Sequence, residues 1–169
     1  RGDGTWAAAG STSATDLTSG TLPTGRLPTG SILQVVRVDN ETQVTATNSA
    51  YVDVFSSDLS ITAKETGSKF HIFVNLAGLS WPSNTAAANF RAVGAGETLH
   101  LQTHFAYGFG NPADNHRLAA AYNTVTSGTT TQGTTYAFNV EFKNSNSSYT
   151  IKVNEASGHS SLVVMEVAG

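Results

Sequence analysis

The chain has 169 residues, a net charge of −3 and only 12% charged residues, against about 25% in an average soluble protein. This slightly acidic balance, without any basic run, gives no reason to expect nucleic acid as a partner. Hydrophobic residues make up 39% of the chain and 16 residues are glycine. Such a composition is typical of short strands joined by polar turns and excludes a disordered chain.

The chain contains no cysteine, so its stability must come from core packing, from association of copies, or from both. No stretch approaches the roughly 18 consecutive apolar residues of a membrane-spanning helix, and we expect no membrane insertion. No basic-then-apolar signal peptide opens the chain. The first residue is not Met, so we expect the chain to be a piece excised from a longer polypeptide.

Residues 1–30 consist mainly of Gly, Ser, Thr, Pro and Ala, with neither a helical nor a two-residue apolar period. Alone, such a segment cannot bury enough apolar surface to offset its ordering entropy. Leu17, Leu22 and Leu27 recur at a constant spacing, and residues 21–25 (TLPTG) and 26–30 (RLPTG) are near-repeats. This pattern predicts an extended segment whose leucines contact other copies of the chain. A flexible linker is the alternative.

Residues 31–169 are predicted to form one all-β domain. Runs with β-branched or alternating character cover 32–38, 42–47, 51–55, 59–63, 69–78, 89–93, 98–107, 134–143, 149–154 and 160–168. The run 69–78 is the most strongly patterned and predicts a central strand. The run 160–168 predicts a buried closing strand. We expect a jelly-roll-like antiparallel β-sandwich.

Side-chain alternation assigns faces to several of these strands. Leu59, Ile61 and Ala63 are predicted to point inward, and Ile32 is predicted to share a face with Gln34, Val36 and Val38. Loops are expected over 79–88, because of Pro82 and Asn84, and over 108–116. Residues 117–122 (RLAAAY) are ambiguous between a strand and a short helical turn.

No motif for catalysis or for a metal site is present. The acids fall mostly in turns, where they are ordinary, and no nucleophile elbow, phosphate loop or zinc motif occurs. His100 and His104 lie on an expected strand with Cα atoms roughly 13 Å apart, too far to share one ion. We therefore expect no enzymatic activity, no cofactor and no metal, although a single axial ion in a trimer remains an alternative.

Recognition is better supported than catalysis. Aromatic faces stack on sugar C–H surfaces and anchor protein interfaces, and Asn and Asp side chains bind hydroxyl groups. Such residues gather in and beside the two expected loops, so the predicted contact residues are Trp81, Tyr107, Phe109, Asn111, Asp114, Asn115 and His116. The alternative is that Trp81 and Phe109 fold back to cover the core.

The first seven residues, RGDGTWA, resemble a signature of bacteriophage tail fibres, and residues 17–27 (LTSGTLPTGRL) resemble a repeat of the same fibres. Residues 1–3 also spell the integrin-binding tripeptide, but residues 4–6 extend the fibre pattern instead. The domain resembles a fibre-tip family in segments that follow the family's order: 30–36 (GSILQVV), 49–54 (SAYVDV), 59–63 (LSITA), 68–74 (SKFHIFV), 149–154 (YTIKVN) and 162–167 (LVVMEV). Residue Ala63 replaces a frequent Pro, and 79–123 follow the family poorly.

This resemblance implies a homotrimeric fibre tip of a virion, with residues 1–30 as the shaft end and 31–169 as the tip. Leu17, Leu22 and Leu27 would then be trimer contacts. The implied role is non-enzymatic recognition of a bacterial surface glycan or protein, on the extracellular side. Two alternatives remain: a structural trimerisation or decoration domain, and a polysaccharide depolymerase, which would need an exposed acid pair.

Overall fold

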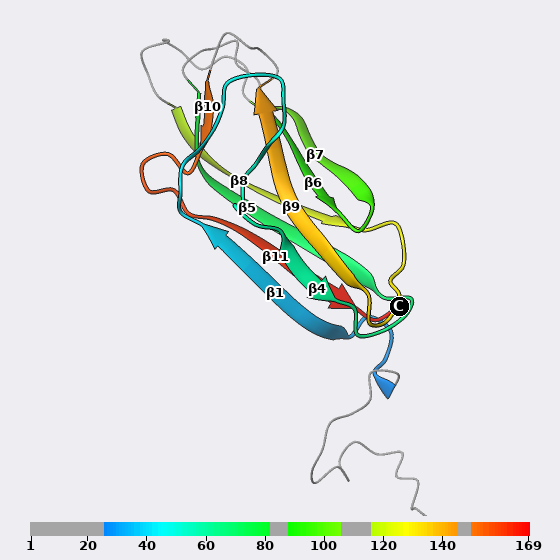
Figure 1. Cartoon of the computed structure of the whole chain (residues 1–169). Coiled ribbons are helices and arrows are strands. Elements are labelled where there is room, and N and C mark those ends of the chain that lie inside the picture. Colours follow the sequence, from blue (N-terminus) through cyan, green and yellow to red (C-terminus); the bar gives the residue numbers. More distant parts are fainter. Residues whose placement is uncertain (1–25, 82–87, 106–115, 145–149) are drawn as a thin grey trace, which may run out of the picture.

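The computed structural model describes residues 26–81, 88–105, 116–144 and 150–169 (Figure 1). These residues form eleven strands and no α-helix, so the predicted all-β class is confirmed. None of the described segments forms a helix with the length and apolar character needed to span a bilayer.

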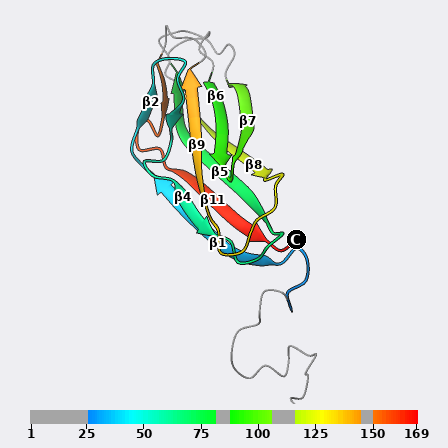
Figure 2. The same ribbon diagram turned by 45° about the vertical axis from the view of Figure 1, so that its right-hand side comes forward.

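Two antiparallel sheets pack face to face as a sandwich (Figures 1 and 2). Sheet A contains β1 (Ile32–Asn40), β2 (Val44–Ala46), β5 (Lys69–Trp81), β8 (His116–Val125), β10 (Ile151–Val153) and β11 (Ser160–Val167). Sheet B contains β3 (Val52–Asp53), β4 (Leu59–Thr62), β6 (Ala88–Gly94), β7 (Glu97–Phe105) and β9 (Thr135–Asn144). The architecture is consistent with the predicted jelly-roll-like sandwich.

The strand order places the two most strongly patterned runs inside sheet A. β5 pairs with β11 and, farther along, with β10 on one side, and with β8 on the other. β11 is flanked by β1 and β5, so the closing strand lies in the middle of the sheet. In sheet B, β9 pairs with β6 on one side and with β3 and β4 on the other, while β7 forms the far edge.

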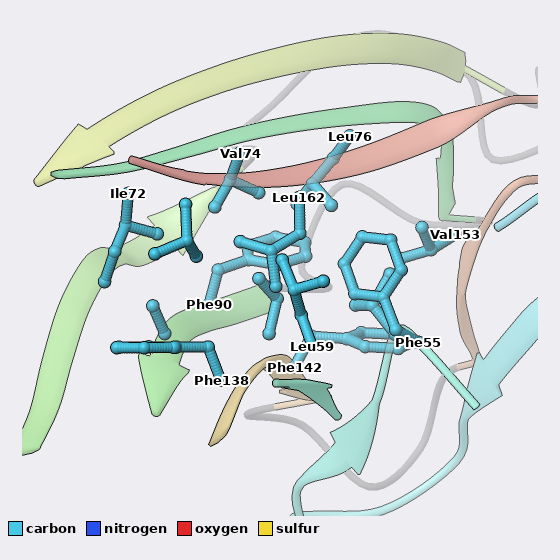
Figure 3. Close-up of a cluster of buried hydrophobic side chains, with 14 of the residues drawn as sticks. Phe55, Leu59, Ile72, Val74, Leu76, Phe90, Phe138, Phe142, Val153 and Leu162 are labelled. Atoms are coloured by element: carbon cyan, nitrogen blue, oxygen red, sulfur yellow. The ribbon is translucent and has the colours of Figure 1, made fainter. Parts of the chain in front are cut away.

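Apolar side chains from both sheets fill the space between them (Figure 3). Strict alternation in β4 buries Leu59 and Ile61, as predicted, and β9 contributes Phe138, Val140 and Phe142. The ring of Phe138 makes an edge contact with Phe70 at 5.2 Å between centroids, one of the aromatic pairs that stabilise cores beyond their buried area.

The face predicted for Ile32 is wrong. Its side chain is 56% exposed and lies opposite Val167, on the outer side of sheet A, whereas Gln34 and Val36 follow the inward phase. A register shift between Ile32 and Gln34 makes Leu33 an extra residue in β1. Because side chains alternate with a period of two, one extra residue moves Ile32 to the opposite face.

Two expectations for the middle of the chain are settled by strand pairing. Residues 117–122 belong to β8, because pairing with β5 satisfies their backbone and overrides the helical preference of alanine. The loop expected from Leu79 begins later, since β5 continues to Trp81 and Leu79 is buried. Ala95 and Gly96 form the turn that joins β6 to β7.

The chain enters the sandwich beside its own last residues. The backbone N–H of Gly30 donates to the carbonyl of Ala168 (3.0 Å), and the Thr29 hydroxyl donates to the carbonyl of Gly169 (3.0 Å). Leu27, one of the predicted trimer contacts, is half-buried here, while Leu17 and Leu22 lie outside the described residues. We call this end of the sandwich the proximal pole.

Candidate functional site

Six strand ends meet at the opposite end of the sandwich, which we call the distal pole. β5, β7 and β9 end there, and β6, β8 and β10 begin there (Figures 1 and 2). The register fixes this arrangement, because Ala88 pairs with both Phe105 and Asn144, and Trp81 pairs with His116. The connections 82–87, 106–115 and 145–149 are therefore all anchored at one pole.

The predicted contact residues divide into two groups. Trp81 is the last residue of β5 and His116 is the first of β8, and their backbones are paired neighbours at the distal pole. Tyr107, Phe109, Asn111, Asp114 and Asn115 lie outside the described residues. The structure thus brings the two ends of the predicted site together, although 35 positions separate them in the sequence.

A cluster that sequence reasoning missed lies on the outer face of sheet B near the distal pole. The guanidinium of Arg91 lies 3.7 Å from the centroid of the Tyr51 ring, and the ammonium of Lys143 lies 4.8 Å from it. Arg91 also forms an ion pair with Glu141 (2.5 Å). An aromatic ring flanked by two cations can contact anionic or hydroxyl-rich groups. These residues come from separate parts of the chain, so no local sequence pattern indicates their meeting.

Acidic side chains border this cluster. Asp53 lies directly opposite Glu141 in the pairing of β3 with β9. Partial burial raises the pKa of the Asp53 carboxyl, and the nearby charges of Glu141 and Asp58 raise it further. The arrangement is a mixed-charge surface in which Glu141 is paired with Arg91 and the pKa of Asp53 is raised.

The proximal pole contains a buried carboxylate with a structural role. Glu166 is fully buried, and its oxygens accept hydrogen bonds from the backbone N–H groups of Lys64 (2.9 Å) and Glu65 (3.2 Å). Further donors are the Ser68 hydroxyl (2.6 Å) and the Gln34 side-chain amide (2.5 Å). With four donor groups satisfied by one acid, Glu166 ties the turn after β4 to the end of β11.

The histidines of the described segments do not gather into a metal site. His159 lies between two acids, with Nε2 3.2 Å from Asp39 and Nδ1 3.1 Å from Glu41, on an exposed surface. Across residues 26–81, 88–105, 116–144 and 150–169, no group of three or more His, Cys, Asp or Glu side chains is placed to hold an ion.

No known family model matches the sequence, and no curated protein matches it. Among solved structures, the chain is similar to T=1 particles derived from infectious bursal virus, with 9% identity and a TM-score of 0.43 over 80% of this chain and 36% of that chain. It is also similar to the VP2 subviral particle of infectious bursal disease virus (11% identity, TM-score 0.41, 80% and 38% covered). A third similar structure is Eiger TNF from S. frugiperda (10% identity, TM-score 0.41, 76% and 91% covered).

These similarities concern the arrangement of strands only. The chain spans little more than a third of the two virus particle proteins. Low identity and low TM-scores mean that activity, partners and assembly have to be argued from this chain's own residues.

Proposed function

We propose that the chain is the tip of a bacteriophage tail fibre, and that its distal pole binds a bacterial surface glycan or protein without catalysis. In this proposal the tip acts as a homotrimer on the virion, with its distal pole facing the cell. The resemblance of residues 1–7 and of the domain strands to fibre tips supplies the protein class. The geometry of the poles supplies the argument for recognition.

One observation carries this argument. The segment that contains most of the predicted contact residues, 106–115, is anchored at the distal pole, and residues 26–31 lie at the proximal pole (Figure 1). A fibre that binds a cell through its tip must present its binding loops away from the shaft. Loops held on a rigid sandwich are also where binding residues concentrate in proteins. The separation of the two poles fits both requirements.

The test measures binding of fluorescently labelled chain, residues 1–169, to a panel of bacterial strains by flow cytometry. The variant carries Tyr107→Ala, Phe109→Ala, Asn111→Ala and Asp114→Ala. A matched control carries Lys64→Ala and Gln132→Ala, two exposed side chains at the proximal pole. We expect at least a roughly tenfold loss of affinity for the first variant, as for the loss of interface anchors, and none for the control.

Other outcomes would contradict the proposal. Equal binding by both variants would remove the distal loops from the binding site. Binding of the chain to no strain would favour the alternative, a structural trimerisation or decoration domain. Release of reducing sugar from surface polysaccharide would instead support a depolymerase.

A further inference from the structure

The most exposed large hydrophobic side chains of the described residues all belong to one face of one sheet. Ile32, Val35, Phe73 and Val125 are 56%, 53%, 41% and 40% exposed. They lie on β1, β5 and β8 of sheet A and point away from the sandwich core, as the register shows. Exposed hydrophobic residues scattered singly are ordinary, but a contiguous group on one face marks an interaction surface.

Strand register makes this group contiguous. Val35 on β1, Met165 on β11, His71 on β5 and Val125 on β8 lie opposite one another in a single row across four strands. The next row contains Arg37, Val163, Phe73 and Asn123, and the row at the proximal end contains Ile32, Val167 and Lys69. We call the outward side chains of Ile32, Val35, Phe73, Val125, Val163, Met165 and Val167 the apolar face.

The surface of the apolar face is hollowed beside Phe73. A shallow depression of about 230 Å³ is lined by Phe73, Asn75, Ala121, Asn123, Ser161 and Val163. A side chain of a partner can pack into this depression against Phe73 and Val163.

The outer face of sheet B differs in character. Its strands present Asp53, Arg91, Glu141 and Lys143, with an ion pair between Arg91 and Glu141. That face has the polar composition expected for the solvated side of an antiparallel sheet. Among the side chains that the structure describes, the most exposed large hydrophobic ones therefore lie on sheet A and not on sheet B.

We infer that the apolar face packs against other copies of this chain. This inference rests on the homotrimer in the proposed function and assigns it a surface. The argument for a second copy comes from where the chain enters. The backbone N–H of Gly30 donates a hydrogen bond to the carbonyl of Ala168 at the proximal end of the apolar face, beside Ile32 and Val167.

Twenty-five residues precede the described part of the chain, and they include two of the three leucines that sequence reasoning expects to contact copies. If copies associate through these leucines, as the sequence predicts, residues 26–31 of the copies come together. The proximal ends of their apolar faces then lie side by side. A partner of another kind would have to displace copies that are already held at this position.

The apolar face is about half the size of a standard interface, so we expect residues 1–30 to supply the rest of the contact between copies. Four strands about 4.8 Å apart and about seven residues long, at about 3.3 Å each, give a footprint of roughly 400 Å². A standard interface covers about 800 Å² on each partner. Three charged side chains border the apolar face. Arg37 and Asp39 pair at 2.7 Å on the edge strand β1, and Lys69 lies opposite Val167 at the proximal end.

The test measures the solution mass of residues 1–169 by light scattering on a sizing column at about 10 μM, since association depends on concentration. We expect three times 17.6 kDa for the unmodified chain. Phe73→Glu and Val35→Glu, each introducing a charge into the apolar face, should lower the mass threefold. Ala137→Glu, at an exposed position on β9 of sheet B, should leave it unchanged.

A second measurement does not depend on whether the charged variants fold. Since the chain has no cysteine, Phe73→Cys introduces its only thiol, and Ala137→Cys provides the matched control. In the assembled protein we expect the thiol at 73 to react with a maleimide at least about tenfold more slowly than the thiol at 137, because the partner covers it.

Three results would overturn the inference: a mass of 17.6 kDa for the unmodified chain, an unchanged mass in both charged variants of sheet A, or equal thiol reactivity at the two positions. These results are separable from the recognition role. A monomer that binds bacteria would overturn the homotrimer and its assigned interface and would leave recognition standing. A trimer closed through the apolar face that binds no strain would overturn recognition alone.

Discussion

The hydroxyl of Ser68 donates a 2.6 Å hydrogen bond to the buried carboxylate of Glu166 across 98 positions of sequence. This contact closes the proximal pole, because the same carboxylate also binds the backbone N–H of Lys64. Hydrogen-bond donors around a buried carboxylate stabilise its negative charge. When one donor is lost, part of the free-energy cost of burying the carboxylate is no longer compensated.

Glu166→Gln is expected to lower the free energy of unfolding by about 2–4 kcal/mol. The new amide NH₂ is a hydrogen-bond donor, and it would face groups that donate hydrogen bonds to the carboxylate of Glu166. Ser68→Ala removes one donor and should cost only about 1 kcal/mol. Urea unfolding followed by circular dichroism measures both. A loss for Glu166→Gln no larger than that for Ser68→Ala would show that the charge of Glu166 is not required.

Tyr122→Phe should leave stability unchanged or raise it slightly at neutral pH. The buried hydroxyl of Tyr122 has no hydrogen-bond partner within the described part of the chain, while its ring stacks on Phe90 at 6.3 Å. Removing an unsatisfied polar group while keeping the ring is close to neutral or stabilising. Thermal unfolding of the two proteins tests this, and a loss above about 1 kcal/mol would contradict it.

The same residue predicts a dependence on alkaline pH. Burial raises the pKa of the Tyr122 hydroxyl above its usual value. Tyr122 therefore does not change the free energy of unfolding with pH below the unfolded pKa of about 10. As the pH rises from there through the folded pKa, the unfolded chain ionises first and the free energy of unfolding falls. Stability of the unmodified chain should fall more steeply above pH 10 than that of Tyr122→Phe, as measured by urea unfolding at pH 8 to 11.

Gly78 and Gly133 offer a matched pair for backbone strain. Both have positive φ, +57° and +79°, but a Cβ at Gly78 would lie 2.5 Å from the carbonyl oxygen of Glu155, whereas Gly133 has open space. Gly133→Ala should cost about 1–2 kcal/mol for the left-handed conformation alone. Gly78→Ala should cost at least about 1 kcal/mol more, because β5 must move away from residue 155. Equal losses of unfolding free energy would show that this close approach relaxes freely.

Asp53→Asn is expected to stabilise the chain modestly at pH 7. Burial, then Glu141 and Asp58, raises the pKa of Asp53, so its ionised form is disfavoured in the folded state. Ionisation of Asp53 lowers the free energy of unfolding, and this loss disappears as the pH falls through the folded pKa to below the unfolded pKa of about 4. The stabilisation by Asp53→Asn should therefore vanish below about pH 4. Like charges directly opposite in a sheet cost about 0.2–1 kcal/mol. In a Glu141→Gln background the gain should shrink, and an unchanged gain would rule out this pair as a cause.

The strands with regular alternation could be predicted from the sequence, and the exceptions have local physical causes. The burial of Leu59 and Ile61 could be predicted because no extra residue interrupts the alternation of side chains in β4. Ile32 changed face because Leu33 is an extra residue, and a bulge has no signature in such a short apolar run. β8 was ambiguous because its alanines are compatible with a helix until β5 pairs with them.

The candidate site was predictable by residue type and not by position. Its anchors, Trp81 and His116, meet only because β5 and β8 are neighbours, and strand order is not encoded in local periodicity. Glu166 did carry a usable signal, because it shares the inward phase of Leu162 and Val164. An acid in phase with buried residues indicates a buried, fully bonded carboxylate. Its donors, such as Ser68, still required the structure.

The position of β11 between β1 and β5 has a consequence for how the protein is made. Until residues 160–167 have left the ribosome, sheet A remains in two separate parts, and β1 and β5 have no strand between them. The domain therefore cannot complete its fold gradually during synthesis. Long-range pairings of this kind form in milliseconds to seconds, so each nascent chain passes through an interval in which apolar strand edges are open and copies on neighbouring ribosomes can reach them.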